Sequence, residues 1–74
     1  MEQIGDTLKY IRENLGLTQA QLADQTGLRQ QAISLWERDE RAPNIYACIA
    51  LADFYGLTID ELIGREFGKT KYGK

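Results

Sequence analysis

Histidine is absent from this chain of 74 residues, and cysteine and proline each occur once. Histidine is the commonest general base and metal ligand, and a single cysteine forms neither an internal disulfide nor a zinc site. The sequence therefore predicts no enzyme, no metal site and no cofactor. Cys48 lies among apolar residues and is expected to be a small core residue of a protein from a reducing compartment.

Long hydrophobic runs are also missing. The longest, residues 47–52, is far shorter than the roughly 20 residues that span a bilayer, and residues 1–3 lack the basic start of a signal peptide. Hydrophobic residues still make up 43% of the chain, which is enough for one small core. We therefore expect a single cytoplasmic domain without a membrane segment.

A basic excess is missing as well, since 9 Lys and Arg residues stand against 11 Asp and Glu residues, for a net charge of −2. This balance counts mildly against nucleic acid as a partner, because proteins that bind it usually carry a basic footprint. Screening limits charge interactions to about 8–10 Å at physiological salt, so local clusters matter more than the total. Arg29, Arg38 and Arg41 form such a group around residues 30–37.

Apolar residues recur at helical spacing, with no strand-like alternation, and predict an all-α fold of five helices. The first helix covers residues 5–15 and ends at Gly16, which can adopt the left-handed conformation. The apolar face of this first helix consists of Ile4, Leu8, Ile11 and Leu15.

Residues typical of helix N-caps indicate where further helices begin. Thr18 and Gln21 form a capping-box pattern for a second helix that reaches residue 26, and Thr58 with Glu61 repeats the pattern for a short fifth helix. The third helix is expected over residues 30–38. Asn44 is a favourable N-cap for a fourth helix, which ends at Gly56. The apolar face of the fourth helix is expected to consist of Ile45, Cys48, Ile49, Ala52 and Tyr55.

The second and third helices are separated by a short turn that contains Gly27. Two helices joined by such a turn form a helix-turn-helix, in which the second helix enters the major groove of DNA. Residues 30–38 are therefore the candidate recognition helix, and the rest of the chain is its support.

The chain resembles the Cro/C1-type (XRE) helix-turn-helix repressors over about residues 4–64. The segments that carry the resemblance are GLTQAQLA at 16–23, Gly27 with Ile33 and Ser34, Trp36 with Glu37, Pro43, residues 51–57 and IDEL at 59–62. This resemblance implies a compact five-helix, lambda-repressor-like domain. Two positions depart from the family pattern: Arg29 replaces the usual Ser or Thr, and Asp39 replaces a usual Gly.

The first turn of the recognition helix touches base edges in this family, which makes Gln30 and Gln31 the leading base-contact candidates. Glutamine pairs bidentately with adenine, although it is also simply a good exposed helix former. Ser34 and Leu35 lie one turn further on. Leu35 is equally consistent with a core position and with contact to a thymine methyl group.

Gln19 matches the family residue that bonds a DNA phosphate and braces the recognition helix. Arg29, Arg38 and Arg41 are the other phosphate candidates, and ordinary surface polarity is the alternative for them. Arg29 cannot accept a hydrogen bond as an N-cap, so the first N–H groups of its helix are left for water or an anion. Phosphate contacts set register and salt dependence but carry no sequence information.

Two further assignments are structural. In several family members residues at the positions of Arg12 and Glu37 form a partly buried ion pair, and we expect the same pair here. Asp39 suits a left-handed backbone better than most residues.

The domain is expected to span residues 1–64, followed by a loose basic tail over residues 65–74. Ile59, Ile63 and Phe67 are spaced as one apolar strip and are candidate dimer contacts.

Together these features predict a sequence-specific, double-stranded DNA-binding regulator of transcription, a repressor of prokaryotic or phage type. A homodimer on a pseudo-palindromic operator is the expected complex. The same fold also serves as the antitoxin of a toxin-antitoxin pair, as the controller of a restriction system, or as a protein-interaction module that does not use DNA.

Overall fold

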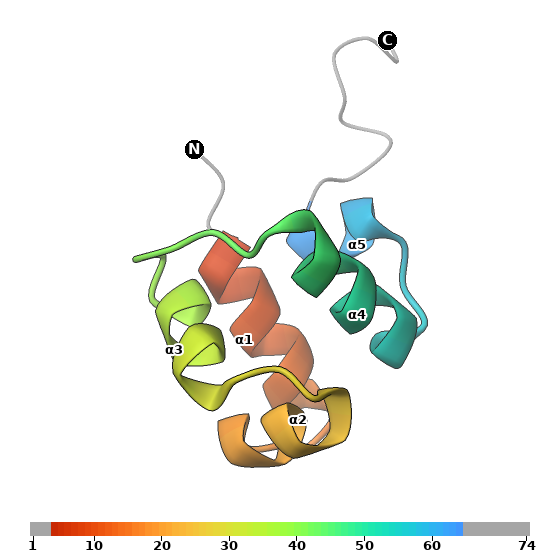
Figure 1. The fold of residues 1–74 in the computed structure, drawn as a ribbon. Coiled ribbons are helices and arrows are strands. Elements are labelled where there is room, and N and C mark those ends of the chain that lie inside the picture. Colours follow the sequence, from red (N-terminus) through yellow and green to blue (C-terminus); the bar gives the residue numbers. More distant parts are fainter. Residues whose placement is uncertain (1–3, 65–74) are drawn as a thin grey trace, which may run out of the picture.

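The computed structural model describes residues 4–64, and the expected tail with Phe67 lies outside these residues. The described chain is entirely helical between its turns, with no strand (Figure 1). Its helices are α1 (Ile4–Asn14), α2 (Gln19–Thr26), α3 (Gln30–Glu37), α4 (Ile45–Tyr55) and α5 (Ile59–Ile63). The predicted all-α, five-helix fold is confirmed for this part of the chain, and none of these helices is long and apolar enough to cross a membrane.

The helix starts follow from local hydrogen bonds. Thr18 Oγ1 accepts from the backbone N–H of Gln21, while the Gln21 side chain accepts from the Thr18 N–H. Thr58 and Glu61 make the same reciprocal pair at the start of α5. Asn44 Oδ1 accepts from a first-turn N–H of α4 at 2.8 Å. These caps satisfy backbone donors that a helix start otherwise leaves free.

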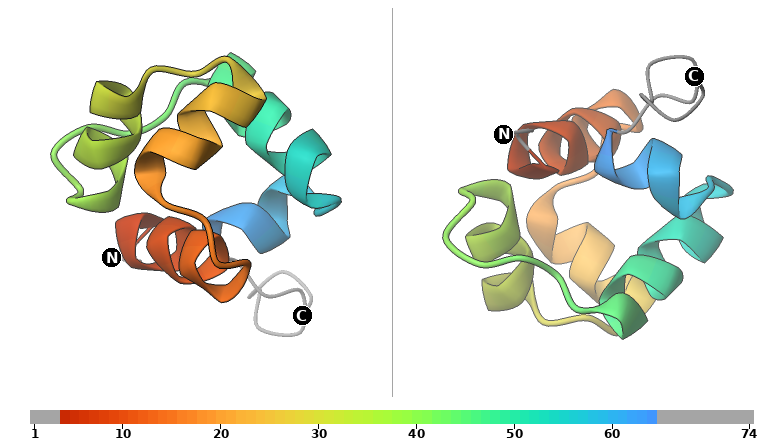
Figure 2. Two further views of the ribbon diagram at one scale, coloured as in Figure 1. Left: turned by 90° about the horizontal axis from the view of Figure 1, so that it is seen from below. Right: turned by 90° about the horizontal axis from the view of Figure 1, so that it is seen from above.

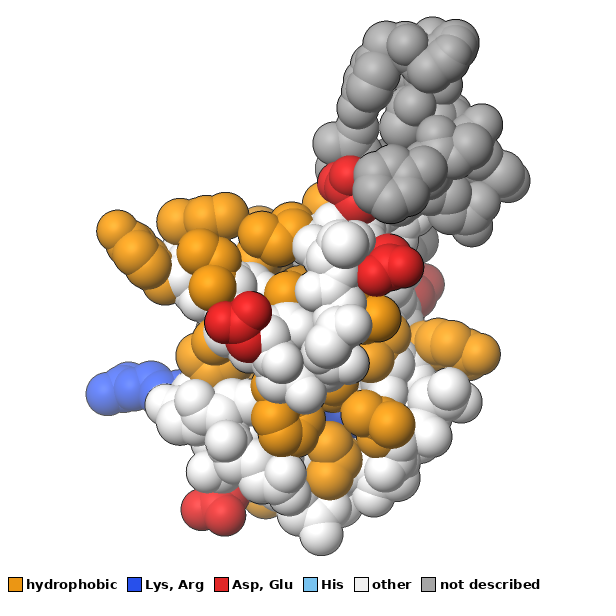
Figure 3. All heavy atoms as spheres, turned by 90° about the vertical axis from the view of Figure 1, so that its right-hand side faces the viewer, with side chains coloured by type: hydrophobic (Ala, Val, Ile, Leu, Met, Phe, Trp, Pro, Cys, Tyr) orange, Lys and Arg blue, Asp and Glu red, His pale blue; other side chains and the backbone are white. Residues whose placement is uncertain are grey.

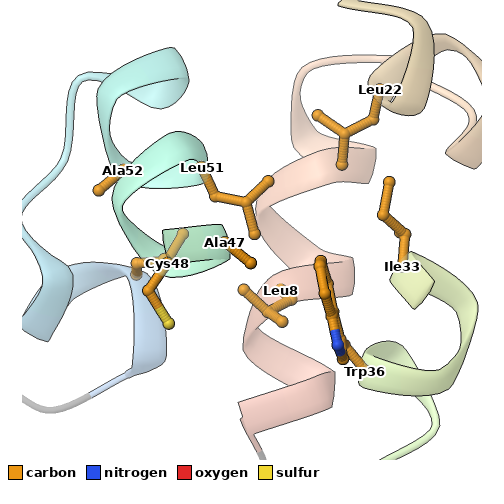
Figure 4. Packing of buried hydrophobic residues seen from close by; sticks show 9 residues of the cluster. Leu8, Leu22, Ile33, Trp36, Ala47, Cys48, Leu51 and Ala52 are labelled. Atoms are coloured by element: carbon orange, nitrogen blue, oxygen red, sulfur yellow. The ribbon is translucent and has the colours of Figure 1, made fainter. Parts of the chain in front are cut away.

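α1 packs against α3 on one side and α5 on the other, and α5 in turn packs against α4, so that the helices form a ring in the views of Figure 2 (Figures 1 and 2). α2 lies across the end of α1 and packs against both α3 and α4. The buried apolar side chains between these helices form one cluster, and in Figure 4 Leu22 of α2 points toward Ile33 of α3. Trp36 stands beside Leu8 of α1, so it is a packing residue of the core.

Two predicted apolar faces are wrong in detail. Leu15 is 58% exposed because α1 ends one residue earlier, at Asn14. On α4, Ile45 and Ile49 are exposed. The residues that α4 buries are instead Ala47, Cys48, Leu51 and Ala52. α4 carries apolar residues on every side, so periodicity alone does not define which side faces the core.

α1 and α3 meet at a glycine. Gly5 is buried, and a Cβ at this position would lie 2.6 Å from the carbonyl oxygens of both Trp36 and Glu37. The Gly5 N–H donates to Asp39 Oδ1 at 3.0 Å. Asp39 itself has a φ of +59°, the left-handed conformation expected from its sequence. The end of α3 is therefore anchored directly on the first turn of α1.

This close approach predicts that Gly5→Ala destabilises the domain by about 1–3 kcal/mol, because two backbone oxygens must move to admit the methyl group. The steric cost outweighs the smaller gain in helix propensity that alanine brings. Urea unfolding measures the difference. The control is Lys9→Ala on the exposed side of α1, expected within about 0.5 kcal/mol of wild type. A Gly5→Ala protein as stable as wild type would contradict the close packing.

Candidate nucleic-acid interface

The recognition helix α3 has one buried side and one exposed side. Ile33, Trp36 and Glu37 are buried against the other helices. Gln30 and Gln31 are exposed in the first turn. The helix is therefore held by its inward side chains, while both glutamines are free to contact a partner.

The outer surface of α3 is shallowly hollowed. Gln31, Ser34, Leu35 and Arg38 line this open depression, which brings three base-contact candidates beside one phosphate candidate. Ser34 and Leu35 are half-buried, and Leu35 does not belong to the core cluster or to the residues packed on it. Leu35 therefore lines the depression on the outer side of α3.

The start of α3 has no side-chain cap. Arg29 occupies the N-cap with an extended backbone, and its side chain accepts no hydrogen bond. The unsatisfied first-turn N–H groups and the exposed Arg29 guanidinium lie at the same end of the helix. Both favour a negatively charged group such as a phosphate.

The two arginines of the following loop differ in their surroundings. Arg38 is exposed, its Nε donates to the Ser34 carbonyl at 3.3 Å, and its Nη1 lies 3.4 Å from Glu40 Oε2. Part of its charge is therefore offset within the chain. Arg41 is exposed and has no acidic partner among residues 4–64, so its charge is more available to an anion.

Behind the helix-turn-helix, Arg12 and Glu37 form a buried ion pair. Arg12 Nε donates to Glu37 Oε2 at 2.6 Å and Arg12 Nη2 donates to Glu37 Oε1 at 2.9 Å, with only 9% and 4% of the two side chains exposed. Arg12 Nη1 donates to the Leu17 carbonyl at 2.6 Å. The hydrogen bond to Glu37 raises the pKa of Arg12, so the guanidinium stays charged. The expected pair is thus present and joins α1, α3 and the loop before α2.

Gln19, which the family resemblance implied would brace the recognition helix, belongs to the same group of contacts. Its Nε2 donates to Glu37 Oε1 at 2.9 Å, so the first residue of α2 is tied to the last residue of α3. The identity of the Gln19 partner, Glu37, and the bond between Gly5 and Asp39 were not predicted. Both bonds link residues far apart in the chain, and their only signal in the sequence is the presence of polar residues at helix ends.

Comparison with known proteins identifies the family. Residues 8–62 match the sequence profile described as Helix-turn-helix. The chain belongs to this family. The resemblance to Cro/C1-type repressors is confirmed, and the helix-turn-helix consists of α2, the turn at Gly27 and α3.

Members of the helix-turn-helix family with known roles are similar over most of the chain. The HTH-type transcriptional activator BcrR of Enterococcus faecalis is 36% identical over 86% of this chain and 31% of its own length. The immunity repressor protein of Bacillus phage phi105 is 32% identical over 85% of this chain and 44% of its own. The solved DNA-binding domain of BldD from S. venezulae superimposes with a TM-score of 0.71 at 31% identity, covering 84% of this chain and 93% of that domain. The chain thus spans less than half the length of these two curated relatives and nearly all of the BldD domain.

The buried pair predicts a strongly asymmetric response to substitution. Arg12→Met alone should destabilise the domain by about 3–5 kcal/mol, because the buried Glu37 carboxylate loses its charge partner. The double variant Arg12→Met/Glu37→Met should recover much of this loss, since both charges are then gone. Urea unfolding of wild type, both single variants and the double variant gives the coupling energy. Additive single effects would show that the two charges do not interact.

Proposed function

We propose that this domain binds duplex DNA sequence-specifically with α3 in the major groove and regulates transcription, as a repressor of prokaryotic or phage type. The observation that carries the proposal is the outer side of α3. It presents exposed Gln30 in the first turn and a hollow that Gln31 lines with Ser34 and Leu35, on a helix whose inner side is fixed by the core. Membership of the helix-turn-helix family supports this use of the surface.

Phosphate contacts in this proposal come from the edges of the same surface. Arg29 and the free N–H groups at the start of α3 provide one contact, and Arg38 with Arg41 in the next loop provide others. Gln19 contributes from the start of α2. Few cations are involved, so we expect a modest dependence of affinity on salt. The site of action is the cytoplasm, where bacterial DNA lies, and the domain acts by binding rather than by catalysis.

A homodimer on a pseudo-palindromic operator is part of the proposal. One recognition helix reads too few base pairs for the selectivity that a repressor needs, and two copies would place their helices about 34–36 Å apart. Ile59 and Ile63, the described dimer candidates, are half-buried, and Ile59 packs on the core. More apolar surface is offered by Ile45 and Tyr46 of α4. Figure 3 shows hydrophobic side chains across this α4 and α5 side, with Asp and Glu side chains among them.

If Gln30 and Gln31 contact bases directly, replacing either one should weaken binding to the preferred operator but not to other DNA sequences. Gln30→Ala or Gln31→Ala should cost about 1–3 kcal/mol of binding there, and little on random duplex, because a bidentate pair with adenine is lost. Selecting operators from a random DNA pool with wild type and each variant tests this. Preference should relax at one position in each half-site.

The matched control is Gln25→Ala, the same change at an exposed residue of α2. It should return the wild-type consensus. If both α3 variants also return an unchanged consensus, with equal information at every position, specificity lies with other residues or with DNA shape.

The unpaired charge of Arg41 predicts a change in salt dependence alone. Arg41→Ala should lower the slope of log affinity against log salt by about one, because one phosphate contact and its released counterion are lost. Sequence preference should stay as in wild type. Lys9→Ala removes the same charge from α1 and should leave the slope unchanged. An unchanged slope for Arg41→Ala would remove this residue from the interface.

A further inference from the structure

Arg38 lies on the same side of the recognition helix as the base-contact candidates. It follows α3 directly as its C-cap, and it lines the shallow depression on the outer surface together with Gln31, Ser34 and Leu35. Gln31 and Arg38 are close to two helical turns apart, so they share one face and lie about 10 Å apart along the helix axis. Because one base-pair step of DNA is about 3.4 Å, Arg38 reaches a different base pair from Gln31.

Two contacts within the chain orient the Arg38 guanidinium. Its Nε donates to the Ser34 carbonyl at 3.3 Å, and its Nη1 lies 3.4 Å from Glu40 Oε2. Nη2 donates no hydrogen bond to any group of residues 4–64. Arginine carries its N–H donors in a planar fork, so parallel donors on Nη1 and Nη2 are left for a bidentate contact. The side chain is 57% exposed, and a partner can therefore reach this outer edge.

Glu40 makes a neutral acceptor a better partner for Arg38 than an anion. Its exposed carboxylate lies against the same guanidinium that would hold the partner. A phosphate on the outer edge of Arg38 would lie within about 8 Å of this carboxylate, a distance over which charges are only partly screened. A base edge carries no net charge and meets no such repulsion. Among the bases, guanine presents two acceptors, O6 and N7, that match the arginine fork.

We infer that Arg38 contacts the O6 and N7 edge of a guanine in the major groove, and that Glu40 favours this edge over a backbone phosphate. The inference rests on the proposed function, because α3 must lie in the major groove for Arg38 to reach a base. It replaces the phosphate contact assigned to Arg38 there with a contact that carries sequence information. Arg38 then reads a base pair of each half-site that the first turn of α3 does not reach.

Selecting operators from a random DNA pool with wild type and with Arg38→Ala tests the contact. Wild type should return a guanine at one position of each half-site, and this position should differ from those that change in Gln30→Ala and Gln31→Ala. Arg38→Ala should lose the guanine preference there and keep the rest of the consensus. An unchanged consensus would overturn the inference, and a salt slope lower by about one would then place Arg38 on a phosphate.

A modified operator tests the atoms involved. Replacing N7 of the selected guanine by carbon removes one acceptor and leaves Watson–Crick pairing intact. This change should weaken wild-type binding by about threefold to tenfold, the effect expected for one hydrogen bond. Arg38→Ala should bind the modified and unmodified duplexes equally. An equal loss for wild type and Arg38→Ala would show that another residue reads this guanine and would overturn the inference.

Glu40→Gln tests why Arg38 prefers a base edge. Without the carboxylate a phosphate can bind Arg38, so affinity for random duplex should rise by about threefold to tenfold and the salt slope should increase by about one. The guanine preference should weaken at the same position. Glu40→Gln/Arg38→Ala should not show the gain. A gain that persists without Arg38, or a guanine preference as strong as in wild type, would overturn the role inferred for Glu40.

The matched control is Asp53→Asn, which removes the same charge from an exposed residue of α4. It should bind random and selected duplexes as wild type does, because Asp53 lies outside the proposed DNA-binding surface. Failure of the wild-type protein to bind any duplex at low salt would remove the proposed function as a whole. Sequence-specific binding without a guanine that depends on Arg38 would remove this inference alone.

Discussion

The buried ion pair between Arg12 and Glu37 is the interaction on which the rest of the helix-turn-helix geometry depends. Removing two charges from water is costly, and the cost is met only because every oxygen of Glu37 accepts a well-placed donor. This requirement fixes α1, α3 and the start of α2 relative to one another. A slip of α1 against α3 would leave a buried charge without a partner, so the pair acts against alternative packings of these two helices as well as for the native one.

The two sides of α3 have different roles in the domain. Ile33 and Trp36 hold the inner side of this helix in the core, and Gly5 lets its end approach α1 closely. Asp39 then anchors the loop that carries Arg41. The exposed residues on the outer side of α3 are therefore not needed for packing of the core. The exposed Gln30 and Gln31 do not belong to the core cluster, so they can be exchanged without disturbing the fold.

Features set by neighbouring residues could be predicted from the sequence. The capping boxes at Thr18 and Thr58 need only residues three positions apart, and the left-handed Asp39 follows from its own side chain. The ion pair was reached only through the family resemblance. The resemblance also implied that Gln19 braces the recognition helix but did not identify its partner, Glu37, 18 positions away, and the bond from Gly5 to Asp39, which spans 34 positions, was missed. The buried side of α4 was misjudged because apolar residues surround that helix.

The most direct test of the central claim is to titrate the isotope-labelled protein with its selected duplex and follow backbone and glutamine side-chain amide signals by NMR. A rigidly supported reading surface predicts the largest shifts at Gln30, Gln31 and the side-chain amide of Gln19. Signals of the Arg12 and Glu37 backbone should change little, because the support is already formed in the free protein. Shifts confined to α4 and α5, with α3 unchanged, would contradict the account.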